Sequence, residues 1–232
     1  MVDWGASAMK VYATMPGGKY VPFAESLETD PLPPGAKRSV YVNLTNRCNC
    51  ACTFCLRGLK DMGPERTLWF GAEGEPTVAE IADELRALPR ERLAETVFCG
   101  FGEPTLRLDA LLELLRICKE ERPEVPTRLN TNGLAELEWG RPVAQDFAGL
   151  LDVVSISLNA STPARHFALT RAKFGERSWA AMLAFAESCK KHVPHVVLTV
   201  VDHVEDGAEI DACRALCKER GLTLRVRPWE GS

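Results

Sequence analysis

The stretch SVYVNLTNRCNCACTFC, residues 39–55, joins a short apolar strand to a run of four cysteines within eight residues. Strands of this kind, rich in β-branched residues, recur along the chain with helical patterns between them. The predicted strands span residues 39–44, 96–100, 127–131, 153–159, 195–201 and 223–229. Strands that alternate with helices form a parallel sheet with right-handed crossovers. The fold class is therefore α/β. Six units, two fewer than a closed eight-unit barrel has, favour an open partial (β/α)6 barrel over a flat, doubly wound sheet.

The segments between these strands carry helix signals. Thr77 and Glu80 form a capping box, which predicts the start of a helix at Val78. Apolar residues recur at helical spacing in three segments: Val78, Ile81, Leu85 and Leu88; Leu111, Leu114, Leu115 and Cys118; Met182, Phe185, Ala186 and Cys189. A last helix is predicted from about Ala208 to Gly221. Its Cys213 and Cys217, like Cys118 and Cys189, are expected to pack in the core.

Residues 1–38 are predicted to precede the core as an N-terminal extension. Within it, KVYATMPGGKYVPF, residues 10–23, has the pattern of a β-hairpin whose turn is Pro16-Gly17-Gly18. A proline-rich connector follows at residues 30–35. The sequence therefore divides into a hairpin extension with its linker, 1–38, and an α/β core, 39–232.

The composition argues against several classes of protein. The chain has 232 residues, with 28 Lys and Arg against 32 Asp and Glu, and its net charge of −4 offers no basic footprint for duplex nucleic acid. No apolar run is long enough to span a membrane, and the start of the sequence has no secretory signal. Nine cysteines, an odd number with a clump of four, favour metal ligation over disulfides. We therefore expect a reducing compartment, the cytoplasm.

The cysteine clump follows the first core strand, and parallel α/β folds bind ligands at the carboxyl ends of strands. A structural zinc site normally needs two ligand pairs separated by a spacer, and no second CxxC follows. An ordinary [4Fe–4S] protein needs four thiolates, often with proline after the last one, where this chain has Leu56. A zinc-binding module and a non-enzymatic iron–sulfur electron carrier stay open as alternatives.

The spacing Cys48-x3-Cys52-x2-Cys55, with the aromatic Phe54 before the last cysteine, resembles the CxxxCxxC signature of radical S-adenosylmethionine (SAM) enzymes. This resemblance implies that the three thiolates bind a [4Fe–4S] cluster and leave one iron for SAM, which binds through its amino and carboxylate groups. Cys50 is an additional thiol within the motif. We expect it to be a loop residue that does not bind the cluster, with ligand exchange or a redox role as the alternative.

The second core strand leads into GFGEP, residues 100–104, which resembles the GGEP-type segment of the same family. The resemblance implies that Gly100, Gly102, Glu103 and Pro104 bind SAM, because glycines let backbone carbonyls approach its ammonium group. The alternative is a turn that leads into a helix, with Glu103 favoured by the helix dipole.

Polar residues at the ends of later strands predict a wet ligand cavity. Ser155, Ser157 and Asn159 alternate with apolar residues that must face the helices, so the polar set faces the interior. The resemblance implies the following further SAM contacts: Asn130, Asn132, Ser157, Asn159 and Arg171. Capping and turn chemistry is the alternative for Asn132, and an exposed surface position is the alternative for Arg171.

The same alternation places three arginines, Arg128, Arg225 and Arg227, on the interior face. Buried guanidinium groups need anionic partners, so we expect at least one of them to bind a carboxylate or phosphate of the substrate. The alternative is an edge strand whose arginines are solvated.

Within radical SAM enzymes, YVNLTNRCNCACTFCLR (residues 41–57) together with FCGFGEPTLR (residues 98–107) looks most like the TatD-associated subfamily. The superfamily resemblance implies an enzyme whose reduced cluster cleaves SAM to methionine and a 5′-deoxyadenosyl radical, which abstracts hydrogen from a small-molecule or peptide substrate. A flavodoxin- or ferredoxin-type electron donor and a functional link to a TatD-type hydrolase are the implied partners. Residues 56–76 are a candidate lid. A glycyl-radical-activating enzyme and a ring-forming enzyme like 7-carboxy-7-deazaguanine synthase are the alternative activities.

Overall fold

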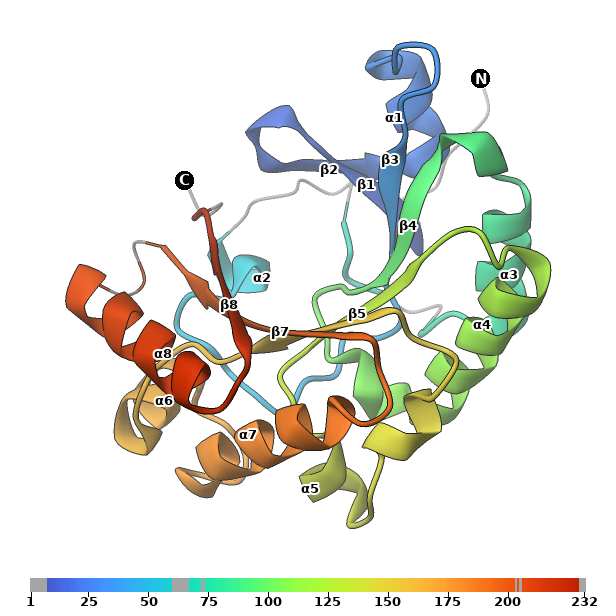
Figure 1. Cartoon of the computed structure of the whole chain (residues 1–232). Coiled ribbons are helices and arrows are strands. Elements are labelled where there is room, and N and C mark those ends of the chain that lie inside the picture. Colours follow the sequence, from blue (N-terminus) through green and yellow to red (C-terminus); the bar gives the residue numbers. More distant parts are fainter. Residues whose placement is uncertain (1–7, 60–66, 72–73, 203, 205, 230–232) are drawn as a thin grey trace. The chain divides into compact units, whose positions relative to one another are not determined.

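The computed structural model describes residues 8–59, 67–71, 74–202, 204 and 206–229, and Figure 1 draws the chain from its N-terminal hairpin to its last strand. The chain divides into two compact units, each with strands and helices of its own. The first unit comprises residues 1–47 and 61–128, and the second comprises residues 48–60 and 129–232. The candidate lid falls partly on residues 60–66, 72 and 73, which lie outside the described residues, as does His203.

The first unit contains the N-terminal hairpin and the first parallel strands. Its strands are β1 (Val11–Met15), β2 (Lys19–Pro22), β3 (Arg38–Val42), β4 (Leu93–Phe98) and the start of β5 (Thr127–Thr131). Its helices are α1 (Phe23–Thr29), α3 (Val78–Arg86) and α4 (Leu108–Glu121), with short 3₁₀ helices η1 (Pro16–Gly18), η2 (Arg90–Arg92) and η3 (Pro104–Arg107). The predicted hairpin and helices are present. The short helix α1 was not predicted, because its seven residues lack a capping side chain.

The hairpin extends the parallel part of the sheet instead of standing apart from it. β1 pairs antiparallel with both β2 and β3, and β3 pairs parallel with β4. Gly17 and Gly18 take positive φ angles of 75° and 69° in the turn, where other residues would be strained. Tyr12 stacks on Tyr41 with 5.3 Å between the ring centroids and packs edge-on against Tyr20, which fixes the hairpin to β3.

The second unit contains the cysteine segment and the last strands. Its strands are the end of β5, then β6 (Val153–Ser157), β7 (His195–Val201) and β8 (Thr223–Arg227). Its helices are α2 (Leu56–Leu59), α5 (Ala135–Trp139), α6 (Pro163–Thr170), α7 (Arg177–Cys189) and α8 (Gly207–Glu219), with the 3₁₀ helix η4 (Ala144–Phe147). β6, β7 and β8 pair in parallel, and α7 and α8 pack against them (Figure 1).

The two faces of β6 differ as the alternation predicts. Val154 and Ile156 are completely buried, whereas Ser155 and Ser157 on the opposite face are half-buried. All four cysteines on the predicted apolar helix stripes, Cys118, Cys189, Cys213 and Cys217, are buried as expected. Burial raises the pKa of the Cys189 thiol to about 12 and that of Cys217 to about 11, which suits core residues.

The strand order is β2-β1-β3-β4-β5-β6-β7-β8, with β2 and β8 as the two end strands. The six strands predicted for the core are all present, and the sheet is not closed. The predicted fold class, an open α/β sheet with an N-terminal hairpin, is therefore confirmed. Among the described residues, no helix has both the length and the apolar character that a membrane span requires.

Candidate functional site

Four cysteines gather in the loop that leads into α2 in the second unit. Cys48, Cys52 and Cys55 are half-buried, and Cys50 is buried. The backbone N–H of Cys50 donates to Cys48 Sγ at 3.4 Å, and the Cys50 thiol is hydrogen-bonded with the thiols of Cys48 and Cys52. Cys55 is near enough for the charges of Cys52 and Cys48 to act on its pKa. The loop therefore brings the three predicted ligands and the additional thiol together.

The pKa values of Cys50 and Cys52 are shifted in opposite directions. Its hydrogen bonds with Cys48 and then Cys52, together with burial, raise the pKa of Cys50, so this thiol keeps its proton. The hydrogen bond from Cys50 lowers the pKa of Cys52, which favours its thiolate. Burial raises the pKa of Cys55. Because thiolates bind metals and thiols do not, this pattern suits Cys52 as a ligand and Cys50 as a residue that donates to it.

The cysteine loop is attached to the end of helix α6. The last carbonyls of a helix have no partner inside it, and here the loop supplies donors. Ala51 N donates to Thr170 O at 2.9 Å, and Thr53 N donates to Leu169 O at 2.9 Å. Arg171 ends α6 with a left-handed φ of 46°. The side chain of Arg171 is exposed, so what the structure adds for this residue is a backbone role, and its predicted contact with SAM stays a prediction.

The side chain of Asn132 is engaged by protein groups of the second unit. Its Nδ2 donates to Asn49 Oδ1 at 2.6 Å and lies 3.6 Å from Cys50 Sγ. Its Oδ1 accepts from Leu134 N at 3.0 Å. Asn132 therefore performs the turn chemistry that was its alternative role, and it also holds the cysteine loop.

The polar face of the last strands is continuous across β6, β7 and β8. The parallel register places Ser157 opposite Thr199, and Thr199 opposite Arg225. One step further along, Val201 lies opposite Arg227. Within the described part of the chain, neither arginine side chain has an ion-pair or hydrogen-bond partner. Arg225 is exposed and Arg227 is half-buried on the end strand β8. Two such guanidinium groups beside the hydroxyls of Ser157 and Thr199 can bind an anionic group.

Two asparagines lie at the ends of strands on this unit. Asn159 is buried just after β6 and has a left-handed φ of 60°, which is uncommon for a residue other than glycine. Asn130 Oδ1 on β5 is buried, and no described residue donates a hydrogen bond to it. An unsatisfied buried acceptor costs about 1–3 kcal/mol, so a ligand that donates to it would be stabilised. Asn130 is therefore a suitable contact for a polar cofactor.

The GFGEP segment belongs to the first unit, where its glycines have a packing reason. A Cβ on Gly100 would lie 2.0 Å from Asn43 Oδ1, and one on Gly102 would lie 2.2 Å from Thr45 O. Glu103 N donates to Arg47 O at 2.8 Å. The segment thus packs directly on residues 43–47, which follow β3, and this contact alone requires both glycines.

Glu103 caps the 3₁₀ helix η3, as its alternative role predicted. Its Oε1 accepts from Thr105 N at 3.1 Å and from Thr105 Oγ1 at 2.8 Å, with Pro104 in the first turn. The carboxylate is almost fully buried. The contact of this segment with SAM stays a prediction.

Arg128 has an anionic partner within the protein. Its guanidinium pairs with Glu95 at 2.7 Å, and Glu95 Oε1 also accepts from Ser39 Oγ at 2.8 Å. All three residues lie in the first unit, on strands β5, β4 and β3. A carboxylate of the protein therefore neutralises this guanidinium group, and a contact of Arg128 with substrate stays a prediction.

The four cysteines fit an iron–sulfur cluster better than a single zinc ion. Within the described ranges, no three His, Cys, Asp or Glu side chains are arranged to hold a single metal ion. A [4Fe–4S] cubane binds each thiolate to a different iron, so its ligands need not converge on one point. Three half-buried thiols in one loop, with the pKa of Cys52 lowered, fit the cubane better than a mononuclear site.

An open, mostly parallel α/β sheet with a three-cysteine loop after its first parallel strand defines a class of iron–sulfur enzymes that use SAM. The family model described as the radical SAM superfamily matches residues 42–217. The chain belongs to this superfamily, whose members are enzymes that use a [4Fe–4S] cluster and SAM.

The curated relatives have different activities. A GTP 3′,8-cyclase of Mycobacterium marinum is 31% identical over 188 residues, which cover 80% of this chain and 48% of the relative. A probable dual-specificity RNA methyltransferase RlmN of Synechococcus is 33% identical over 97 residues, which cover 42% of this chain and 26% of the relative. This chain spans about half or less of the length of these relatives, so their activities do not transfer to it directly.

Two solved structures have a similar fold. A radical SAM methyltransferase from Sphaerobacter thermophilus aligns with a TM-score of 0.61 and 21% identity, over 85% of this chain and 57% of that one. Streptococcus suis SuiB bound to the precursor peptide SuiA aligns with a TM-score of 0.61 and 16% identity, over 89% of this chain and 42% of that one. At these identities the likeness concerns the fold alone.

Proposed function

We propose that this chain is the catalytic core of a radical SAM enzyme that acts on an anionic small molecule. Cys48, Cys52 and Cys55 would hold a [4Fe–4S] cluster, and Cys50 would remain a protonated thiol that donates to Cys52. When bound, the cluster supplies one electron to cleave SAM into methionine and a 5′-deoxyadenosyl radical, which takes a hydrogen atom from the substrate. The gathering of three thiols in one loop, in a chain of this superfamily, is the observation that carries the proposal.

The SAM contacts are proposed residue by residue within each unit. In the second unit, the unsatisfied Asn130 Oδ1 supports a contact with a donor of SAM, and the strained Asn159 and the half-buried Ser157 lie at the end of the neighbouring strand. In the first unit, the carbonyls of GFGEP, residues 100–104, would accept from the ammonium group. Phe54 is half-buried in the cysteine loop and would pack beside the bound cofactor.

The substrate class is proposed from Arg225 and Arg227. Both arginines share a strand face with Thr199 and lack a protein partner within the described residues. Guanidinium groups bind carboxylates and phosphates through paired hydrogen bonds. The name of the M. marinum relative states that GTP, a phosphorylated nucleotide, is its substrate, which supports an anionic substrate here.

We further propose that this chain belongs to the TatD-associated subfamily and has a functional link to a TatD-type hydrolase. Its electron donor would be a flavodoxin or ferredoxin, and its location the cytoplasm. The chain would divide into an extension (1–38) and a catalytic core (39–232). A deazapurine-type ring-forming step remains one reaction that the arginine pair would suit.

Anaerobic reconstitution tests the proposed function. The protein is loaded with iron and sulfide, its cluster is characterised by electron paramagnetic resonance, and dithionite and SAM are added. We expect 5′-deoxyadenosine and methionine, measured by mass spectrometry. An electron carrier or a zinc-binding module would form neither product, and that result would overturn the proposal.

A further inference from the structure

Asn49 lies between Cys48 and Cys50, and its polar groups are bound by three other segments of the second unit. Its Oδ1 accepts from Asn132 Nδ2 at 2.6 Å, and its Nδ2 donates to Glu138 Oε2 at 3.2 Å. Its backbone O accepts from Lys173 N at 2.8 Å. The residue is 8% exposed, so few waters compete for these hydrogen bonds. The cysteine loop is therefore fixed at this point by side chains and backbone from distant parts of the chain.

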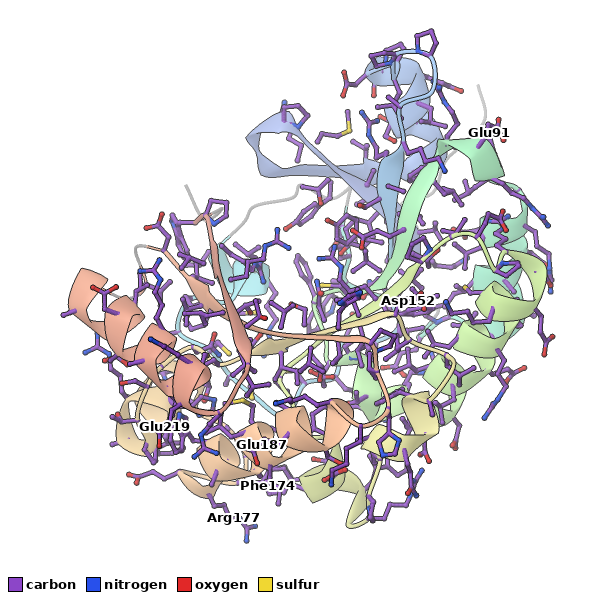
Figure 2. All side chains as sticks on the ribbon, in the orientation of Figure 1. Glu91, Asp152, Phe174, Arg177, Glu187 and Glu219 are labelled. Carbon is purple, nitrogen blue, oxygen red and sulfur yellow. The ribbon has the colours of Figure 1, made fainter. Side chains whose placement is uncertain are left out.

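Glu138 and Lys173 close this arrangement into a ring. Lys173 Nζ donates to Glu138 Oε1 at 2.8 Å, while the other oxygen of Glu138 accepts from Asn49. Lys173 thus holds the loop twice, through its backbone N–H on Asn49 and through its ammonium group on Glu138. The hydrogen bond from the Lys173 ammonium group lowers the pKa of Glu138, and the hydrogen bond from Asn49 lowers it further. The carboxylate is therefore charged at neutral pH. Figure 2 labels Phe174, over whose ring Lys173 Nζ lies at 5.2 Å.

The two charged residues of this ring are partly exposed, and its asparagine side chains connect it to the thiols. The side chain of Lys173 is 58% exposed and that of Glu138 is 23% exposed. Asn132, which donates to Asn49, also lies 3.6 Å from Cys50 Sγ, and the Cys50 thiol is hydrogen-bonded with the thiols of Cys48 and Cys52. One carboxylate and one ammonium group are therefore connected to the cysteine loop through two amide side chains.

We propose that Asn49, Glu138 and Lys173 form a clamp that positions the cysteine loop and sets the electrostatic environment of the cluster it holds. This inference rests on the proposed function. The three are positioning residues, because they act through the loop. Groups that hold metal ligands tune both affinity and reduction potential. If the clamp acts in this way, the charges of Glu138 and Lys173 should shift the reduction potential of the cluster in opposite directions.

The signs follow from the charge of the added electron. The Glu138 carboxylate disfavours reduction of the cluster, so Glu138→Gln should shift the reduction potential to a more positive value. The Lys173 ammonium group favours reduction, so Lys173→Met should shift it to a more negative value, while its backbone N–H still binds Asn49 O. Both substitutions break the same ion pair. A purely structural role would move both potentials in one direction or leave them unchanged.

The first experiment measures these potentials by redox titration of the reconstituted protein, followed by electron paramagnetic resonance. Lys173→Arg should restore the wild-type value. The matched control is Glu187→Gln, because Glu187, which Figure 2 labels, pairs with Arg220 at 2.6 Å in the same unit. Opposite shifts for Glu138→Gln and Lys173→Met, with no shift in the control, support the clamp. Shifts of the same sign, or none, overturn it.

The second experiment measures the anchoring without any cluster. In the cluster-free protein, Asn49→Ala should expose the buried Cys50 and raise its rate of labelling by a thiol reagent, followed by mass spectrometry. We expect a faster rate than in the wild-type protein, because the substitution removes the hydrogen bonds of Asn49 with Asn132 and Glu138. Glu187→Gln should leave the rate unchanged. Unchanged labelling in Asn49→Ala overturns the clamp, and a wild-type protein that assembles no cluster instead overturns the proposed function.

Discussion

The cysteine loop and the GFGEP segment both resemble the family in sequence, but their local structures are maintained in different ways. GFGEP, residues 100–104, combines a local cap with contacts to a segment far earlier in the sequence. Glu103 caps its own helix, and the two glycines allow contact with residues 43–47. The backbone of the cysteine loop is hydrogen-bonded with residues far later in the sequence, among them Leu169 and Lys173. Both segments therefore depend on distant residues, and the difference between them is the local contribution that the Glu103 cap makes to GFGEP.

The largest effect should come from the cysteines themselves. Cys52→Ser should abolish cluster assembly and 5′-deoxyadenosine formation, because the substitution removes the thiol whose pKa is lowered. Cys50→Ser should keep the cluster, since the pKa of Cys50 is raised and its thiol remains protonated. Iron content and the electron paramagnetic resonance spectrum measure both variants. A Cys50→Ser protein without a cluster would contradict the division of roles between these residues.

Helix α6, to which the cysteine loop is attached, carries a buried histidine that should make the stability of the protein depend on pH. Burial lowers the pKa of His166 on α6 to about 4, and no described residue hydrogen-bonds its Nδ1. An unfolded histidine has a pKa near 6.5, so between about pH 6.5 and pH 4 the unfolded state binds more protons. The contribution of His166 to the free energy of unfolding should therefore be fully present above about pH 6.5. It should be lost as the pH decreases, which lowers the free energy of unfolding by about 3 kcal/mol by about pH 4.

Urea unfolding of the cluster-free protein between pH 7.5 and pH 4 measures this loss. The comparison is the His166→Gln variant, because the glutamine side chain does not ionise. The variant should lack the histidine component of the pH dependence. Equal pH profiles for the two proteins would mean that His166 is protonated in the folded state or is not buried.

The packing of the GFGEP segment predicts the next effect. Gly102→Ala places a Cβ 2.2 Å from the backbone oxygen of Thr45, which cannot move as a side chain can. The free energy of unfolding should decrease by about 1–3 kcal/mol, as for other overpacked positions. Gly207→Ala is the control, because a Cβ there has no atom within 4 Å. If urea unfolding shows the same stability for both variants, the close packing of this segment is disproved.

The smallest effect should come from the cap of η3. Glu103→Ala removes the acceptor for Thr105 N and Thr105 Oγ1, and loss of a cap costs about 1 kcal/mol. Glu103→Gln retains an oxygen acceptor and should lose less. Urea unfolding of both variants at neutral pH checks the order. A Gln variant as unstable as the Ala variant would show that the charge, and not the hydrogen bonds, stabilises this turn.

Much of the fold could be predicted because its signals are local. The predicted strands 127–131 and 195–201 match β5 and β7 residue for residue. Thr77 and Glu80 form the predicted capping box, and the serines of β6 lie on the face opposite its buried residues. Each of these features depends on residues within one turn of helix or one strand, where sequence spacing fixes the geometry.

The candidate site could be predicted only in part. The spacing of Cys48, Cys52 and Cys55 brings the thiols into one loop, since the three lie within eight residues. The partner of Arg128 could not be predicted, because Glu95 lies 33 positions earlier in the sequence. The alternation rule placed Arg128 correctly on a strand face and gave no information on which residues share that face. The clamp was missed for the same reason, and no sequence signal marks it.

The sequence by itself determined the alternation of strands and helices, the hairpin and the cysteine spacing, because backbone geometry converts short-range patterns directly into structure. Only the tertiary structure decided that Glu95 neutralises Arg128 and that Asn49 is held by Glu138 and Lys173. Such pairs join residues that are tens of positions apart, and they form only when folding packs their separate elements side by side.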